Sequence, residues 1–402
     1  MQLFRIALRN VSRNTRRTLI SVFAIFLGIG VNVAIRGFMN GLQGSLVRNV
    51  VGAKLGAIQI HRDGYVKSIE GVPLNLDFTP DLELVAKLKA IKGVSGVAPR
   101  INFPVMVNKG DETVFALGSA IDPKSEYQVC PEEPKLISKG KPLDGDKGLL
   151  MTAQLAKALD AHVGDTITLL ANDRDGALNG IELPLRGTYV SRMPGLEKTI
   201  VVTLPSAQEL LRMEGRVTEL ALGLANPRAA DELAPRVAAV VPAGYEVHTW
   251  AELAKSITDI MSFQNTFLGV ASAVFLLVAL TLIVNTMMMA VLERVREIGT
   301  MMAVGVRRRQ ILALFLLESG VMGAIGGLLG ALAGWTAVRY MSWRGIDLAV
   351  PGVKAVNILR PEIGFSYLAL TVAMAFVGAV MAAIWPAFSA SRLRPVEALQ
   401  HV

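Results

Sequence analysis

The chain has 402 residues, of which 52% are hydrophobic and only 18% are charged. Because soluble globular domains average about 45–50% apolar and about 25% charged residues, part of this chain is expected to be solvated by lipid. Its 41 Lys and Arg outnumber its 33 Asp and Glu. With 6% aromatic residues and no basic stripe interleaved with aromatics, however, we expect no nucleic-acid partner.

The first apolar run, residues 18–35, contains no charged residue and follows a segment with five arginines and no acid. A cleaved signal peptide would show the same pattern, but no small-x-small cleavage site follows the run, which favours an uncleaved anchor. We therefore predict a cytoplasmic amphipathic segment over residues 1–17 and a transmembrane helix over residues 18–38.

A long polar segment, residues 39–259, comes next and is expected to form an external domain. Residues 37–266 carry a net charge of −3, whereas the rest of the chain carries +11. Apolar residues at helical spacing over residues 81–91 are followed by strand-like segments, and a similar order returns over residues 219–248. These two pieces predict the halves of one split α/β subdomain.

A β-rich insertion is predicted between the two halves, over about residues 122–215. Its first part, residues 125–147, is rich in Pro, Gly and charged residues, which indicates an exposed loop. Short strands are predicted further along, over residues 166–170, 183–190 and 199–203.

The second apolar run, residues 260–292, contains 33 residues without an ionisable side chain. A continuous helix of this length would measure about 50 Å, at about 1.5 Å per residue, against about 30 Å for the hydrocarbon core. We therefore predict a transmembrane helix that continues into a stalk outside the bilayer.

A charged segment, residues 293–310, precedes the third apolar run, residues 311–338. The fourth run, residues 363–391, lies between a loop of residues 339–362 and a tail of residues 392–402. Four glycines of the third run fall on one helical face, which favours either packing within the chain or a dimer contact; they are Gly323, Gly327, Gly330 and Gly334. Glu318 lies near the start of this run, where it is a functional candidate, although snorkelling or pairing with Arg307–Arg309 is the favoured interpretation.

Orientation follows from the Lys and Arg residues beside the spans, which are retained on the cytoplasmic side. They concentrate in residues 1–17, 293–309 and 392–402, which predicts two cytoplasmic termini and a periplasmic segment 37–266. The 339–362 loop also carries four basic residues, against this rule. The predicted fold class is an α-helical membrane protein with four transmembrane helices and a large α+β periplasmic domain.

The chain lacks the sequence motifs of common catalytic and metal sites. The four histidines are widely spaced and are interpreted as surface or turn residues, and the single cysteine, Cys130, forms no pair. Neither a GxSxG elbow nor a GxxxxGK[ST] phosphate loop occurs. We expect no catalytic residue, metal or cofactor in this chain, although a membrane-anchored periplasmic enzyme remains the alternative from a different class.

Several segments resemble the FtsX/MacB-type ABC transporter permeases. LERVREIGTMMAVGVRRRQILALFLLESG (292–320) resembles the coupling segment of that family, and WPAFSASRLRPVEAL (385–399) resembles its ending. ALRNVSRNTRRTLIS (7–21) and GAIQIHRDGY (56–65) resemble its N-terminal region and first external strand. The fused ATPase of MacB is missing and the external domain exceeds that of FtsX, so the chain is most similar to the lipoprotein-releasing LolC/LolE type.

The resemblance implies a mechanotransmission permease. Two permease chains, identical or homologous, would work with two copies of an ABC ATPase subunit that binds ATP and Mg. The implied activity is extraction of lipoproteins or another lipidic substrate from the outer leaflet of the bacterial inner membrane, with a possible periplasmic chaperone or outer-membrane component. The alternatives are MacB-like efflux of drugs or peptides and FtsX-like signalling to periplasmic partners.

The resemblance also implies two sets of site residues. In the coupling helix of residues 293–310, Glu293, Arg296 and Glu297 would face the ATPase, while Gly299 and Gly305 would permit turns. A membrane cleft between the first and second spans of two permeases would hold the acyl chains. Its lining would comprise Val31, Asn32, Ile35, Phe38, Met39, Phe263, Phe267 and Val270.

Overall fold

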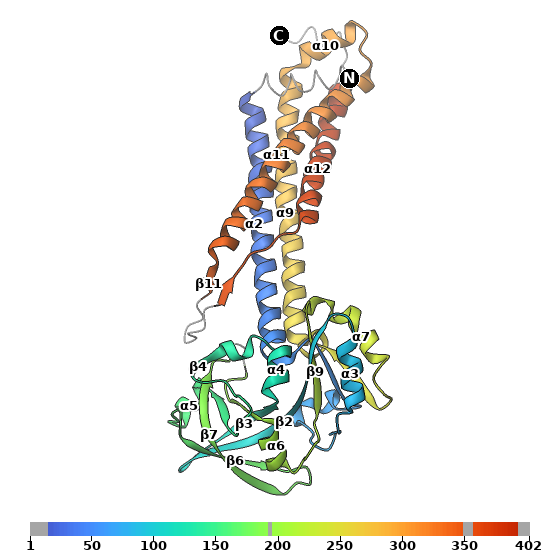
Figure 1. The fold of residues 1–402 in the computed structure, drawn as a ribbon. Coiled ribbons are helices and arrows are strands. Elements are labelled where there is room, and N and C mark those ends of the chain that lie inside the picture. The colour runs from blue at the N-terminus through green and yellow to red at the C-terminus, as the bar shows by residue number, and fades with distance from the viewer. Residues whose placement is uncertain (1–14, 192–194, 349–356, 393–402) are drawn as a thin grey trace. The chain divides into compact units, whose positions relative to one another are not determined.

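The structure is a computed structural model that describes residues 15–191, 195–348 and 357–392 (Figure 1). Most of the predicted 1–17 segment and 392–402 tail, and part of the 339–362 loop, lie outside the described residues. The chain divides into two compact units. The helical unit contains Met1–Gln43, Met261–Ile346 and Ile358–Val402, and the sheet unit contains Gly44–Ile260 and Asp347–Asn357.

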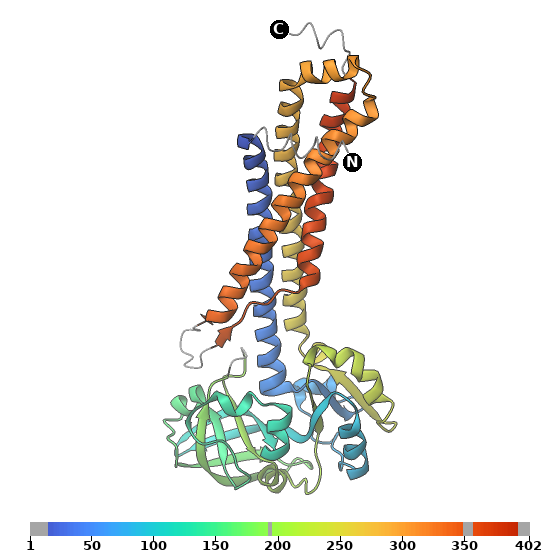
Figure 2. The same cartoon turned by 45° about the horizontal axis from the view of Figure 1, so that its top comes forward.

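Among the described residues, four helices are long and apolar enough to cross a membrane, as the sequence predicts, and they supply the helical unit. They run side by side in both views of the molecule (Figures 1 and 2). Their bounds are α2 Thr15–Val50, α9 Lys255–Glu293, α11 Arg308–Arg344 and α12 Phe365–Ser391, and the shorter α10 comprises Val295–Ala303. Both α2 and α9 are longer than the apolar runs that predict them, because the helical backbone continues through polar residues after residue 38 and before residue 260.

The glycines of α11 contact two different helices of the same chain. A Cβ atom on Gly323 would lie 2.6 Å from the Ala379 Cβ of α12, and one on Gly334 would lie 2.7 Å from the Val33 Cβ of α2. Gly327 likewise faces α12 and Gly330 faces α2. The predicted single face is thus divided between two neighbours, and the absence of side chains lets α11 approach both closely.

The sheet unit is built on a ten-stranded sheet with the order β10-β1-β9-β2-β3-β8-β5-β7-β4, in which β6 pairs with β2 and β7. The strands are β1 Ile58–Arg62, β2 Val94–Lys109, β3 Glu112–Ile121, β4 Ile137–Gly140, β5 Leu149–Thr152, β6 Thr166–Asn172, β7 Leu178–Tyr189, β8 Thr199–Thr203, β9 Glu219–Leu224 and β10 Tyr245–Thr249. A separate two-stranded ribbon pairs β11 Ile346–Leu348 with β12 Asn357–Leu359.

The helices of the sheet unit are short. They are α3 Leu82–Ala90, α4 Pro123–Val129, α5 Ala153–Ala158, α6 Leu204–Leu211, α7 Ala230–Ala238 and α8 Trp250–Leu253, with turns of other helical type at η1 Val51–Leu55, η2 Val66–Gly71, η3 Glu133–Leu136 and η4 Pro227–Ala229. The two predicted halves of the split subdomain lie together, because β1, β2, β9 and β10 are neighbours in the sheet. The predicted insertion continues the same sheet through the β3–β8 and β2–β6 pairs.

The predicted exposed loop over residues 125–147 is wrong for its first part. Asp122 caps α4 by accepting from the Ser125 backbone N–H at 3.2 Å, and Pro123 occupies the first turn. Asp followed by Pro is a signal for a helix start, which the composition of the segment concealed. The helix buries Glu126 and Val129.

Candidate functional site

The coupling segment turns across the end of the helical unit (Figure 2). Glu293 is the last residue of α9, and Arg296 and Glu297 belong to α10; all three are exposed. Gly299 is buried inside α10, so it makes no turn. The turn into α11 instead falls at Gly305, whose φ of 102° favours glycine.

A buried arginine that the sequence reasoning missed fixes the start of α10. Arg294 is 6% exposed, and its Nη1 donates to Glu318 Oε2 of α11 at 3.4 Å. Its Nε lies 3.9 Å from Glu297 Oε2. Glu318 is therefore paired with Arg294, the residue between α9 and α10. The sequence had favoured a partner in the Arg307–Arg309 triplet. Breaking such a buried pair is costly, so the pair holds the coupling helix to α11.

The apolar residues predicted for the membrane cleft are surface residues of α2 and α9. Phe263, Phe267 and Val270 are 71%, 63% and 60% exposed and follow helical spacing. Val31 and Ile35 of α2 are also exposed, and Phe38 and Met39 are partly buried. Another side of α9 faces α2, since Asn265 accepts from Arg36 at 3.1 Å and from Gln43 at 3.3 Å.

Asn32 does not share the surface of those apolar residues. Its Nδ2 donates to Ser272 Oγ of α9 at 2.5 Å, and its Oδ1 accepts from Tyr367 Oη of α12 at 2.7 Å. These bonds join three helices inside the helical unit. The sequence therefore grouped Asn32 with side chains from which the tertiary structure separates it.

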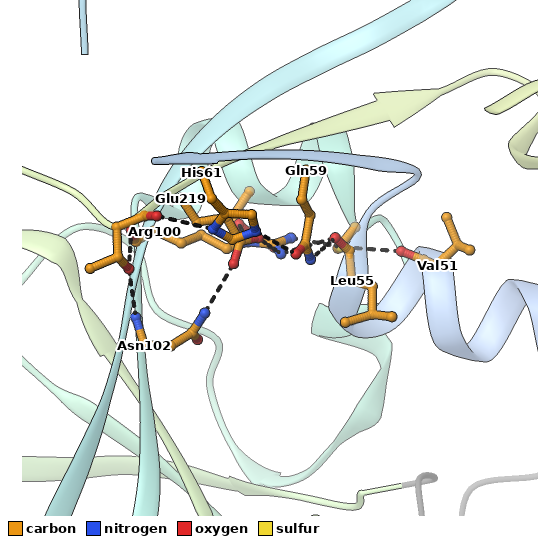
Figure 3. A network of polar contacts seen from close by, with 10 residues as sticks. Val51, Leu55, Gln59, His61, Arg100, Asn102 and Glu219 are labelled. Carbon is orange, nitrogen blue, oxygen red and sulfur yellow. Dashed lines mark hydrogen bonds and ion pairs between the residues drawn. The ribbon is translucent and has the colours of Figure 1, made fainter. Parts of the chain in front are cut away.

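A buried charge network lies in the sheet unit next to the end of α2 (Figure 3). Arg100 of β2 is 3% exposed and donates from Nε and Nη2 to both oxygens of Glu126, at 2.8 and 2.6 Å. Its Nη1 donates to Glu219 Oε1 at 2.8 Å and to the Leu55 carbonyl at 3.2 Å. Arg100 and Glu219 are register partners of neighbouring antiparallel strands, so the sheet itself sets their approach.

The same network reaches the backbone of η1, which directly follows α2. The Leu55 carbonyl also accepts from Gln59 Nε2 at 2.8 Å, and the Val51 carbonyl accepts from the Cys130 thiol at 3.3 Å. The Val51 carbonyl also accepts from the Gly56 backbone N–H at 2.9 Å, whereas the Leu55 carbonyl, at the end of the helix, takes its described donors from outside it. Arg100 and Gln59 supply the donors to Leu55, and Cys130 adds a second donor to Val51, which binds the end of the helix to the sheet.

Burial controls the ionisation of the groups around Arg100. Burial lowers the pKa of His61 and raises the pKa of the Cys130 thiol, which keeps both neutral and the thiol unreactive. Burial, together with the Glu126 carboxylate, raises the pKa of Glu133 to about 8. His61 is 0% exposed, so its interpretation as a surface or turn residue is wrong. Its ring nitrogens lie 3.1 Å from the Thr218 carbonyl and 3.0 Å from Gln59 Oε1.

Sequence signals for these missed residues exist but are weak. Arg100 interrupts an apolar strand and Glu219 opens one, and a charge in such a position usually requires a partner. Nothing in the order of residues identifies Glu126 or Cys130 as that partner, since Glu126 lies in a separate helix, α4, and Cys130 directly follows it. Within the described part of the chain, no three His, Cys, Asp or Glu side chains converge as metal ligands.

Comparison with known proteins gives matches over nearly the whole chain. Residues 18–240 match the family model of the MacB-like periplasmic core domain, and residues 269–395 match that of the FtsX-like permease C-terminal region. The chain is 22% identical to the lipoprotein-releasing system transmembrane protein LolC of Neisseria meningitidis serogroup B, over 96% of this chain and 94% of that protein. It is 25% identical to LolE of Haemophilus influenzae, over 97% and 96% of the two chains.

The macrolide export ATP-binding/permease protein MacB of Nitrobacter winogradskyi is similarly related. It is 26% identical over 96% of this chain, but the match spans only 58% of that protein. The identities to the two kinds of relative are therefore comparable, and the lengths are closer to those of LolC and LolE.

Proposed function

The chain belongs to the family of ABC transporter permeases with a MacB-like periplasmic core domain and an FtsX-like C-terminal region, and from this premise we propose that it extracts lipoproteins or another lipidic substrate. Its four apolar helices and its periplasmic core domain make it an inner-membrane protein with a periplasmic part. As an ABC permease it works with an ATPase partner. The substrate would leave the outer leaflet of the inner membrane.

One observation carries the proposal, which is the apolar surface of α2 and α9. Phe263, Phe267 and Val270 present a row of large side chains that the remainder of the helical unit leaves uncovered. Acyl chains bind to such surfaces because burial of apolar area is favourable and needs no directional partner. A second permease chain, identical or homologous, would close this surface into a cleft.

In the proposal, the exposed side of the coupling segment is the surface on which ATP hydrolysis by the partner acts. In the proposed assembly, two ATPase subunits bind and hydrolyse ATP with Mg²⁺ and press on Glu293, Arg296 and Glu297. The buried Arg294–Glu318 pair supports this role, since a helix tied to α11 can pass a displacement into the bundle. In the proposed topology the coupling segment and both termini lie in the cytoplasm, which the basic residues beside the spans support.

The second candidate function is MacB-like efflux of drugs or peptides, or FtsX-like signalling. The 26% identity to the Nitrobacter winogradskyi macrolide exporter over nearly the whole chain favours keeping it. The two candidate functions predict different partner proteins for the chain. A lipoprotein, with a periplasmic lipoprotein chaperone, fits release, whereas an outer-membrane tunnel fits efflux.

Gentle affinity purification of the chain followed by mass spectrometry tests the proposal. We expect an ABC ATPase and peptides of acylated lipoproteins to co-purify, and neither to accompany an unrelated multi-pass protein that carries the same tag. An ATPase without lipoprotein would favour efflux or signalling. Absence of any ATPase under several mild conditions would contradict the permease assembly.

Substitution Phe267→Asp is expected to block substrate release. A carboxylate on a surface that contacts hydrocarbon is unfavourable by up to about 2.5–3.5 kcal/mol at the membrane centre, so acyl chains would no longer pack there. The measurement is release of lipoprotein from membrane vesicles supplied with ATP. Phe267→Leu, which keeps the apolar contact, is the matched control, and normal release by Phe267→Asp would exclude this surface from the substrate path.

A further inference from the structure

A second apolar space lies inside the helical unit, between α2, α9 and α12. Its cavity volume is about 70 Å³, and it is open at one side. None of the proposed substrate-surface residues except Asn32 contributes to its lining. The space is therefore separate from the surface of Phe263, Phe267 and Val270.

The pocket opens sideways between α9 and α12. Phe275 of α9 and Leu370 and Met374 of α12 all line it, yet they remain 43%, 56% and 47% exposed. Ile25 of α2 lines its inner wall and is only 3% exposed. The medium at such a mouth is the hydrocarbon of the bilayer, so the molecules that can enter are lipid chains.

The length of the pocket corresponds to one leaflet. Its lining on α9 extends from Ser272 to Ile283, which is about 16 Å at about 1.5 Å per residue. Half of a hydrocarbon core of about 30 Å is about 15 Å. The lining of the pocket is therefore about as long as one acyl chain within a leaflet.

Polar groups gather at one end of this apolar space. Asn32 is the last lining residue of α2, while Ser272 and Tyr367 are the first of α9 and α12. Among the described contacts, the second Asn32 amide hydrogen remains available as a donor after the bonds of Asn32 to Ser272 and Tyr367. The Arg36 guanidinium lies 5.9 Å from the centre of the Tyr367 ring at this same end. This end suits a carbonyl acceptor, and the rest suits hydrocarbon.

Gly28 keeps the pocket open from the side of α2. A Cβ atom placed on it would meet nothing within 4 Å. Gly30, two residues further on, instead lies against α11, where a Cβ would be 3.4 Å from the Gly330 carbonyl oxygen. Close helix packing explains Gly30, whereas the missing side chain of Gly28 leaves the space beside it unfilled.

We propose that this pocket binds one long acyl chain of an ester-linked lipid, with the acyl carbonyl at Asn32, Ser272 and Tyr367. The site goes beyond the proposed function, because it requires neither a lipoprotein cargo nor a second permease chain. Its ligand is defined by chemistry, namely a hydrocarbon chain that ends in a carbonyl. A bilayer phospholipid and an acylated substrate both carry that group.

Photolabelling of the complete complex in nanodiscs tests the site. One sample contains a phospholipid with a diazirine on its acyl chain, and the other a triacylated lipopeptide with the same diazirine. We expect labelled peptides from the pocket walls of α9 and α12. Gly28→Phe should reduce this labelling by about tenfold, which corresponds to about 1.4 kcal/mol of lost binding, while Leu27→Phe, one residue away and exposed to lipid, should leave it unchanged.

The two probes identify the source of the chain. Labelling by the phospholipid supports the site with a resident bilayer lipid, and labelling by the lipopeptide supports it with a substrate chain. Equal labelling of wild type and Gly28→Phe, or no label at the pocket walls with either probe, would overturn the proposal. If Gly28→Phe does not fold, Ala279→Leu, which fills the pocket from α9, should reduce the photolabelling in the same way.

Discussion

Replacing Glu297 with lysine is expected to abolish the stimulation of ATP hydrolysis by substrate while the chain still inserts into the membrane. The Glu297 side chain is 52% exposed on α10, beside exposed Arg296. In the proposed assembly Glu297 contacts the ATPase, and a charge reversal there would set like charges against each other, at a cost of several kcal/mol. Since about 1.4 kcal/mol is a factor of ten in affinity, we expect the stimulated rate to fall by about tenfold or more.

Three variants separate this effect from general damage. Glu297→Gln removes the charge without reversing it and should cause a smaller loss. Asp111→Lys makes the same type of change at the exposed turn between β2 and β3 and should leave the rate unchanged. Gly299→Leu should also abolish stimulation, but through overpacking of a buried position of α10. Full stimulation in Glu297→Lys, with normal membrane levels, would remove this side of α10 from the coupling path.

Replacing Arg100 with methionine is expected to destabilise the sheet unit severely. The substitution leaves the Glu126 and Glu219 carboxylates buried without their cation and removes one donor from the Leu55 carbonyl. Breaking a buried ion pair by removing one partner costs about 3–5 kcal/mol. In a domain of this size, each kcal/mol lowers the melting temperature by about 2–4 °C. Thermal unfolding of the purified complex, with limited proteolysis of the sheet unit, measures the loss.

The matched control is Arg186→Met. Arg186 is 42% exposed and lies 3.7 Å from Asp146, and surface pairs contribute about 0–1 kcal/mol. Combining Arg100→Met with Glu126→Gln and Glu219→Gln should recover much of the lost stability, because no buried charge then remains unpaired. An unchanged melting temperature in Arg100→Met would show that the network does not hold η1 to the sheet.

The Arg100 network gives the end of α2 a fixed attachment. Carbonyls of Val51 and Leu55 receive donors from β1, β2 and the residue that follows α4. A displacement of this helix end would therefore be transmitted to the sheet.

Local patterns predicted most elements of the sheet unit. The 81–91 segment forms α3 because Asp81 caps it, and Leu84 and Leu88 follow one another on its buried side. Strands predicted at 166–170 and 199–203 appear as β6 and β8. The helix of residues 123–129 was missed because composition over a long window concealed a short cap.

The sequence by itself determined the four membrane helices, the large α+β part between the first two and the family resemblance. Backbone groups in hydrocarbon must satisfy their hydrogen bonds within a helix, so long apolar runs permit few other structures. Side-chain partnerships across the fold were decided only by the tertiary structure. Asn32 bonds to residues 240 and 335 positions away, and Arg100 meets Glu219 across two strands 119 positions apart. Periodicity defines which face of an element is apolar, but the rotation of each helix and the register of each strand decide what that face contacts.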